Sequence, residues 1–210
     1  MLNLKHFLVC FFALDALLVS LCSCSGQNDV DMLDDMSVYQ NGDIVFRLGD
    51  SSVSNLVMVA DEKSDFSHVG IVWIDNGCPM IIHACPPDID DVDPDNCVKM
   101  DSVSVFFSNK NAINGALYRF TDKNVAYDAA TTAKGFYDDA VPFDYNFDSN
   151  DTTALYCTEL VERAFMKYGV SLSDNQRRSV DIPGVNIDSC ILISDFVNND
   201  RLSLIASFGE

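Results

Sequence analysis

Apolar residues recur every three or four positions in the segment 157–165, which reads CTELVERAF. This spacing predicts a helix that begins at or near Cys157 and stops at Gly169. The preceding loop, 148–153, offers Thr152 or Thr153 as the N-cap. The buried face of the helix would carry Leu160, Val161, Ala164 and Phe165.

A second pattern predicts a β-hairpin. The runs 68–74 and 80–84 are rich in β-branched and other apolar residues, and Asn-Gly stands at 76–77 between them. This dipeptide is the strongest short signal for a two-residue hairpin turn. The turn would place Asp75 opposite Cys78.

The register of this hairpin brings two histidines together. His83 would face Gly70, and Cys85 would face His68. Directly opposed residues share a face of the sheet, so both imidazoles would point the same way. Gly70, which has no side chain, would leave room between them.

The other patterns complete an α+β fold, a small antiparallel sheet packed against helices. The polar segment 173–184 is expected on the surface or near a cleft entrance. Further strands are predicted at 44–48, 115–120 and 201–208, and a further helix at 124–137.

Composition narrows the class of protein. A chain of 210 residues suits one domain with a sizeable core. With 32 acidic and 13 basic residues, the net charge of −19 excludes nucleic acid as a partner. The acidic segment 86–101 lacks the glycine and the final glutamate of an EF-hand, so we expect a solvated loop and no calcium site.

The N-terminus has the pattern of an export signal. An apolar stretch, 7–21, follows a short polar start and ends at Leu21-Cys22-Ser23-Cys24. This end resembles the lipobox of bacterial lipoproteins, in which the cysteine is lipidated. We therefore expect a signal segment at 1–24, with Cys24 lipidated, and an acidic tether at 25–36.

The folded domain would then be 37–210, held on a membrane of the cell envelope, on its periplasmic or outer-surface side. An uncleaved anchor and plain secretion are the alternatives.

Cysteine usage is compatible with a free, reactive thiol. Eight cysteines are present, of which Cys10 and Cys22 would leave with the signal. Cys24 would carry the lipid, so the domain keeps an odd number of cysteines and at least one thiol stays unpaired within the chain. One pair among Cys78, Cys85 and Cys97 is a candidate disulfide. The five cysteines of the domain are Cys78, Cys85, Cys97, Cys157 and Cys190.

These features point to thiol acyl transfer. Free N–H groups and the positive dipole end of a helix favour a thiolate at Cys157, although a buried structural cysteine is the alternative. His68 would deprotonate this thiol or hold it as an ion pair, and His83 would fix the tautomer of His68. Zinc is the rival use of one cysteine and two histidines, but no paired ligand spacing accompanies them. We expect no metal and no cofactor.

Five segments occur in the order found in a known family. They read GDIVF (42–46), FSHVGIV (66–72), IIHA (81–84), PFDYNF (142–147) and YCTELVERAF (156–165). The chain thereby resembles the permuted NlpC-like papain-fold amidases of the YiiX/YaeF type, which are related to the lecithin retinol acyltransferase group.

The resemblance implies a small sheet or barrel packed against helices, with the nucleophile at a helix N-terminus. It implies His68 as base, Cys157 as nucleophile and His83 as the residue that orients the base. Members often carry glutamate at the third position and Tyr-Asp before the cysteine, whereas this chain has His83 and Phe143-Asp144. Candidates for binding the oxyanion or positioning the substrate are Asp144, Tyr145 and Tyr156.

The expected function is a cysteine hydrolase, an amidase or peptidase, that works through a thioester on Cys157. Its substrate would be a peptide, a peptidoglycan fragment or an N-acyl amide such as a lipid amide. The backbone N–H of Cys157 would help to bind the oxyanion. The alternatives are an acyltransferase of the same fold and a catalytically silent, ligand-binding lipoprotein.

Overall fold

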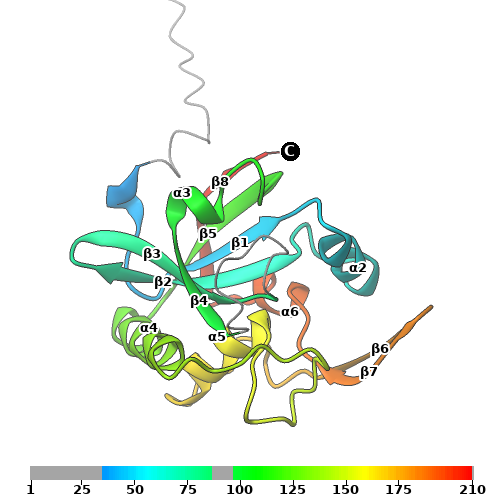
Figure 1. Cartoon of the computed structure of the whole chain (residues 1–210). Coiled ribbons are helices and arrows are strands. Elements are labelled where there is room, and N and C mark those ends of the chain that lie inside the picture. Colours follow the sequence, from blue (N-terminus) through cyan, green and yellow to red (C-terminus); the bar gives the residue numbers. More distant parts are fainter. Residues whose placement is uncertain (1–34, 87–96, 210) are drawn as a thin grey trace, which may run out of the picture.

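The computed structural model describes residues 35–86 and 97–209. The predicted signal, the lipidation site at Cys24 and nearly all of the predicted tether lie outside these residues, as does most of the acidic segment. Within the described ranges, six strands form an antiparallel sheet in the order β4-β3-β2-β1-β5-β8 (Figure 1). The strands are β1 (Ile44–Leu48), β2 (His68–Asp75), β3 (Cys78–Ala84), β4 (Val98–Ser102), β5 (Asn114–Phe120) and β8 (Leu202–Phe208).

The helices surround this sheet, and a separate two-stranded hairpin stands apart from it. None of the helices in the described part of the chain has the length and apolar character needed to cross a bilayer. The helical segments are η1 (Met36–Val38), α2 (Ser52–Ala60), α3 (Val103–Phe106), α4 (Lys123–Asp138), α5 (Cys157–Met166) and α6 (Ser194–Val197). The hairpin consists of β6 (Arg178–Ile182) and β7 (Val185–Cys190).

The β2–β3 hairpin has the predicted register. Asp75 pairs with Cys78, and the pairing continues without a shift to Ile71 and Ile82. Both turn residues, 76–77, have positive φ, as a tight hairpin turn of this type requires. At Gly70, an added Cβ would lie 2.6 Å from Ile81 Cγ2 and 3.2 Å from the Cβ of His83, so a larger residue would displace the neighbouring strand's side chains.

The two faces of the sheet carry different layers. Helices α4 and α5 pack against β2 on one face, where Ile71 and Leu160 belong to the larger apolar core. On the other face, Val72 joins Phe106 of α3 in a second core. Alternation along β2 therefore buries both of its faces, as expected for a central strand.

Helix α5 begins at Cys157, as predicted, but neither predicted threonine caps it. Tyr156 is the N-cap residue, and its side chain makes no capping bond. Thr153 instead donates from its N–H and its hydroxyl to Asp151 in the preceding turn. The helix ends at Met166, and Gly169 follows with a φ of +76°.

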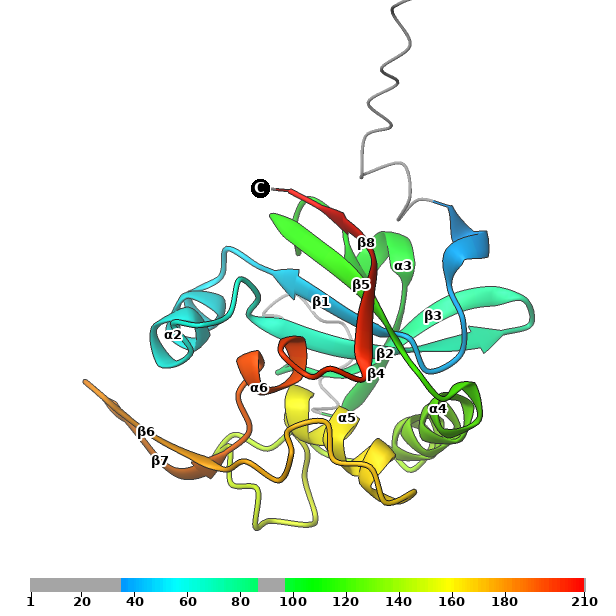
Figure 2. The same cartoon turned by 180° about the vertical axis from the view of Figure 1, so that it is seen from behind.

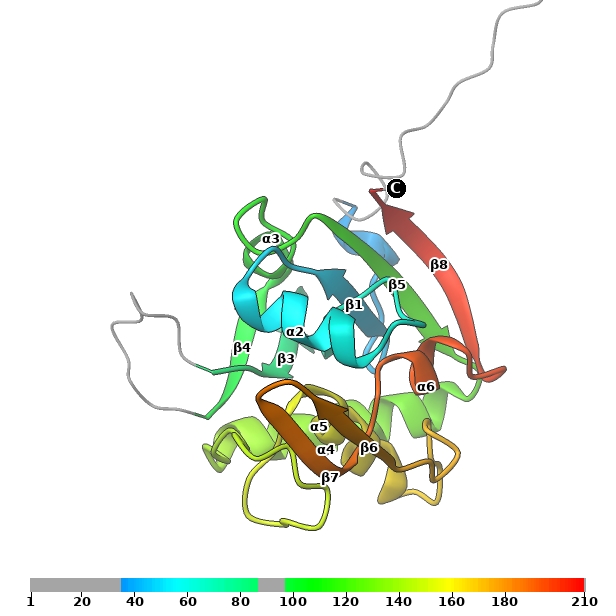
Figure 3. The ribbon, with the colours of Figure 1, turned by 90° about the vertical axis from the view of Figure 1, so that its right-hand side faces the viewer.

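Three elements differ from the sequence predictions. Strand β4 occupies the end of the segment 86–101, where we expected only loop. Helix α2 was not predicted at all. The segment 173–184, expected on the surface or near a cleft entrance, contains β6, which pairs with β7 and lines the cavity described below. Figure 3 shows that α2 and this hairpin face the same side of the molecule. The candidate disulfide is absent, because all five cysteines of the domain are free thiols.

Candidate active site

Cys157 is the first residue of α5, which packs against β2 and β3. Backbone N–H groups of Thr158 and Val69 bond to its sulfur, and they favour the thiolate. Burial nevertheless dominates and raises the pKa of the Cys157 thiol to about 11, and the nearby thiol of Cys85 adds to the rise. The expected thiolate therefore stays a prediction, with the backbone N–H groups favouring the charged form of Cys157 and burial opposing it.

The two histidines meet as the register predicts. His68 Nε2 lies 2.9 Å from His83 Nδ1, and the two rings are nearly perpendicular with their centroids 5.0 Å apart. Both rings also pack against Phe106 of α3, with centroid separations of 5.8 and 5.3 Å. This packing holds the pair in one orientation.

A carboxylate that the sequence analysis missed stands behind this pair. Asp101 Oδ2 lies 3.0 Å from His83 Nε2. The residue belongs to β4, where it pairs with Ile81 of β3. The run Val98-Lys99-Met100 alternates apolar and polar residues, and this was the available signal for the strand.

The surroundings of the two imidazoles shift their pKa values in opposite directions. Burial, followed by the charges of Arg47 and His83, lowers the pKa of His68 well below its usual value. Burial also acts to lower the pKa of His83, but Cys85 and Asp101 outweigh it and raise that pKa. These shifts favour the neutral forms of both His68 and Cys157 at neutral pH, which would suit general-base activation better than a preformed ion pair.

Cys85 is a second thiol of the site that the sequence analysis did not use. It hydrogen-bonds to His83. Burial acts to raise its pKa, but the charges of His83, Lys99 and Arg47 together with this bond lower the pKa below the usual value. The site thus contains two thiols whose acidities are shifted in opposite directions.

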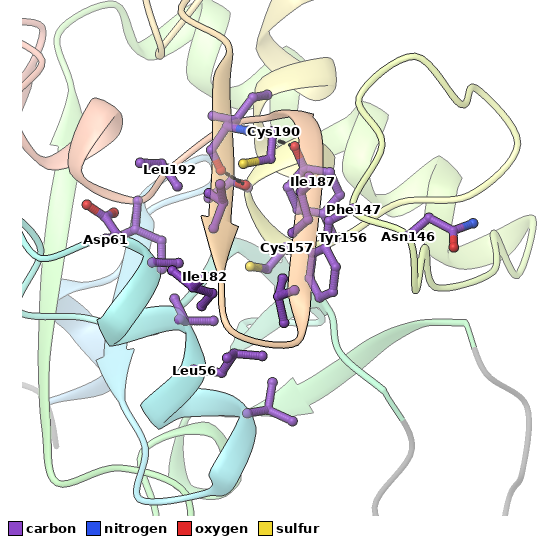
Figure 4. Close-up of a pocket in the computed structure, with 18 of the residues that line it drawn as sticks. Leu56, Asp61, Asn146, Phe147, Tyr156, Cys157, Ile182, Ile187, Cys190 and Leu192 are labelled. Atoms are coloured by element: carbon purple, nitrogen blue, oxygen red, sulfur yellow. Dashed lines mark hydrogen bonds between the residues drawn. The ribbon is translucent and has the colours of Figure 1, made fainter.

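An apolar cavity of about 460 Å³ opens beside Cys157. Figure 4 shows Cys157 between the β6–β7 hairpin and helix α2, which carries Leu56. The other walls come from the loop before α5 and from the segment after β7. Apolar lining residues include Val53, Leu56, Val57, Val180, Ile182 and Ile187.

The three positioning candidates have different surroundings. The Tyr156 hydroxyl bonds to Ser149 Oγ and accepts from the N–H of Ile191, both at 2.8 Å, so it ties two loops together. The buried Asp144 carboxylate accepts from two backbone N–H groups of the turn that follows it. Tyr145 is 56% exposed and lines the cavity, which makes it the candidate best placed to meet a substrate.

The donor set does not form a metal site. Among the residues that the structure describes, no group of three or more His, Cys, Asp or Glu side chains is placed to hold a metal ion.

Comparison with known proteins identifies the family of this chain and a solved structure with a similar fold. A family model of permuted papain-like amidase enzymes (YaeF/YiiX, C92 family) matches residues 38–179. The metalloprotein yiiX from Escherichia coli O157:H7 is similar in structure, with a TM-score of 0.66 and 19% identity, over 81% of this chain and 98% of that chain. The similarity to yiiX shows a shared fold. A search of curated proteins gives no significant match.

Proposed function

We propose that this chain, which belongs to the YaeF/YiiX family of permuted papain-like amidases, is a cysteine hydrolase that cleaves an amide through a thioester on Cys157. The placement of Cys157 carries the proposal. The residue begins α5, lines the apolar cavity, and has its sulfur bonded to the N–H of Val69, the neighbour of His68.

In this mechanism, neutral His68 takes the proton of the Cys157 thiol as the sulfur attacks the amide carbonyl carbon. The C–N bond breaks, and the amine leaves with the proton from His68. Water then attacks the thioester with His68 again as base, which releases a carboxylic acid and restores the thiol. No side chain caps α5, so the N–H of Cys157 is proposed to bind the oxyanion.

The cavity favours one substrate class among those expected from the sequence. Aliphatic side chains dominate its walls, and a sugar or a polar peptide there would lose hydrogen bonds to water without replacing them. An aliphatic chain would instead gain from burial. The proposed substrate is therefore an N-acyl amide whose acyl chain enters the cavity.

Acyl-chain length tests this proposal. Octanoyl p-nitroanilide should acylate Cys157 faster than acetyl p-nitroanilide, as seen by intact-protein mass spectrometry and by nitroaniline release. Leu56→Trp should narrow the cavity and reduce the advantage of the octanoyl compound. Val59, on the same helix, is 58% exposed and does not line the cavity, so Val59→Trp is the matched control.

The same measurements separate the alternatives. An adduct on Cys157 that persists in water and disappears only when an amine is added would identify an acyltransferase. A chain that forms no adduct with either compound, yet melts at a higher temperature with the octanoyl amide, would be a silent binding protein. Adduct formation in Cys157→Ser would show that Cys157 is not the nucleophile.

We also propose that the domain works at the cell envelope on a lipid anchor at Cys24. The apolar stretch 7–21 and the lipobox-like sequence after it support this setting. An anchored enzyme would meet membrane amides directly, which agrees with an aliphatic substrate.

A further inference from the structure

We propose that Asp101 is a positioning residue of this site, which acts through His83 to keep Nδ1 of His68 unprotonated and able to accept a proton. Asp101 itself touches neither the thiol nor the cavity lining. The role of His68 as base rests on the proposed function, whereas the effect of Asp101 on the two imidazoles does not.

Strand pairing brings Asp101 into contact with His83, and His83 into contact with His68. Asp101 on β4 opposes Ile81 on β3, and Ile81 and His83 share a face because they are two positions apart. Asp101 therefore reaches His83 diagonally across the strands, at 3.0 Å. His83 is 1% exposed, while the Asp101 side chain is 30% exposed, so the carboxylate meets water and His83 does not.

The tautomers follow from the inventory of donors and acceptors. An ionised carboxylate can only accept, so His83 Nε2 must carry the proton of its bond to Asp101. In the arrangement that we propose, neutral His83 has a lone pair on Nδ1 that accepts from His68 Nε2–H across 2.9 Å, and the bond between Cys85 and His83 is a further contact of the same ring. Neutral His68 is left with its lone pair on Nδ1, the form that a base requires.

A second proton on His83 would reverse this arrangement. The imidazolium would donate from Nδ1 as well, so His68 would have to accept at Nε2 and would carry its own proton on Nδ1. The groups facing His83 are His68 on β2, Cys85 after β3, Asp101 and Lys99 on β4, and Arg47 on β1. Asp101 and Cys85 raise the pKa of His83, so loss of base function on acidification belongs to this residue.

Nitrogen–proton correlation NMR of the full chain with isotope-labelled histidine tests the tautomers without any substrate. In wild type, both His68 and His83 should carry the proton on Nε2, with His68→Ala and His83→Ala giving the assignments. Asp101→Ala should turn His83 into a mixture of tautomers, and His68 should follow. Asp101→Val, which suits a strand and cannot accept, replaces it if the alanine variant does not fold.

The pH profile of octanoyl p-nitroanilide cleavage is the second readout. Asp101→Ala should lower the plateau of kcat by about tenfold to hundredfold, less than the factor of about 10² to 10⁴ for loss of a general base. The acidic limb of the profile should move to lower pH, because His83 loses the carboxylate that raises its pKa. KM should change little, since Asp101 is remote from the cavity.

Controls separate positioning from general damage. Asp101→Glu should recover part of the plateau, and Asp75→Ala, at the far end of β2, should leave both readouts as in wild type. In a His83→Ala background, Asp101→Ala should add almost nothing, because its effect passes through His83.

Unchanged histidine tautomers in Asp101→Ala would overturn the inference, even if Cys157 is confirmed as the nucleophile. An altered tautomer in a chain that cleaves no amide would support it and would reject the proposed function alone. The inference would also be overturned if Asp101→Ala lowered kcat as much in the His83→Ala background as in wild type, because Asp101 would then act without His83.

Discussion

Burial and neighbouring charges decide the resting state of each reactive side chain. Cys157 has the backbone N–H groups that favour a thiolate, yet burial outweighs them and raises its pKa to about 11. Burial acts to raise the pKa of Cys85 as well, but His83 and two cationic side chains outweigh it and lower that pKa. The proposed nucleophile at the helix start is thus the less acidic of the two thiols, and the more acidic one lies beside His83.

Alkylation across a pH range should reveal this difference. Labelling of Cys157 by iodoacetamide should keep accelerating as the pH rises towards about 11, because only the thiolate reacts. Labelling of Cys85 should level off at a lower pH than an ordinary thiol. Peptide-resolved mass spectrometry after timed alkylation measures both, with Cys157→Ser as the control. A plateau for Cys157 near or below neutral pH would show instead that His68 holds it as a thiolate in the resting protein.

At the residue scale, the sequence predicted the features that depend on residues nearby in the chain and missed those that depend on distant segments. Alternation and a two-residue turn were enough to place His68 and His83 together, because hairpin register depends on neighbours in sequence. The pKa of Cys157 depends on burial, and α2 and the β6–β7 hairpin, distant in the chain, help to enclose the cavity beside it. Asp101 was hidden for a related reason, since only its pairing with β3 gives it a role.

At the scale of elements, the closest approach in the described structure that needs a glycine joins β1 to α4. A Cβ added at Gly42 would lie 2.1 Å from the carbonyl oxygen of Ala126, and the φ of Gly42 is +82°. The contact brings α4 against the start of the strand, and α4 in turn packs on α5. Gly42 therefore helps to support the helix that carries Cys157.

Gly42→Ala should destabilise the fold by about 3 kcal/mol or more, since strain in a left-handed conformation adds to a clash with backbone. Gly77 has a φ of +85° but no atom within 4 Å of an added Cβ. Gly77→Ala should therefore cost about 1 to 2 kcal/mol, from strain alone. Urea unfolding measures both variants, and equal losses would contradict the role of the Gly42–Ala126 contact.

The elements that sequence reasoning found are those with strong local signals. They include both strands of the β2–β3 hairpin and the amphipathic helices α4 and α5. Helix α2 was missed because its nine residues are mostly apolar and none of its side chains is fully buried, so no core-facing stripe marks it. Strand β4 has only five residues and follows an acidic run, and short strands depend on their partners for stability.

At the scale of the whole molecule, the proposed anchor connects the site to its surroundings. Cys24→Ser should move the protein from the membrane fraction to the soluble fraction, because lipidation requires the cysteine. Immunoblotting after membrane fractionation measures the distribution, and Cys22→Ser, two residues from the same site, is the matched control. Identical fractionation of wild type and Cys24→Ser would reject the lipid anchor.

The order of strands in the sheet has a consequence for how the chain folds. Strand β8 lies beside β5 at one edge of the sheet, although α4, α5 and the β6–β7 hairpin separate them in sequence (Figure 2). A chain that emerges from its N-terminus completes β1 to β5, with the imidazole pair, before Cys157 appears. Closing the long loop between β5 and β8 slows folding, so the complete sheet forms late. Reactivity towards acyl groups should therefore be the last property that the newly made protein acquires, after the sheet around the histidines has formed.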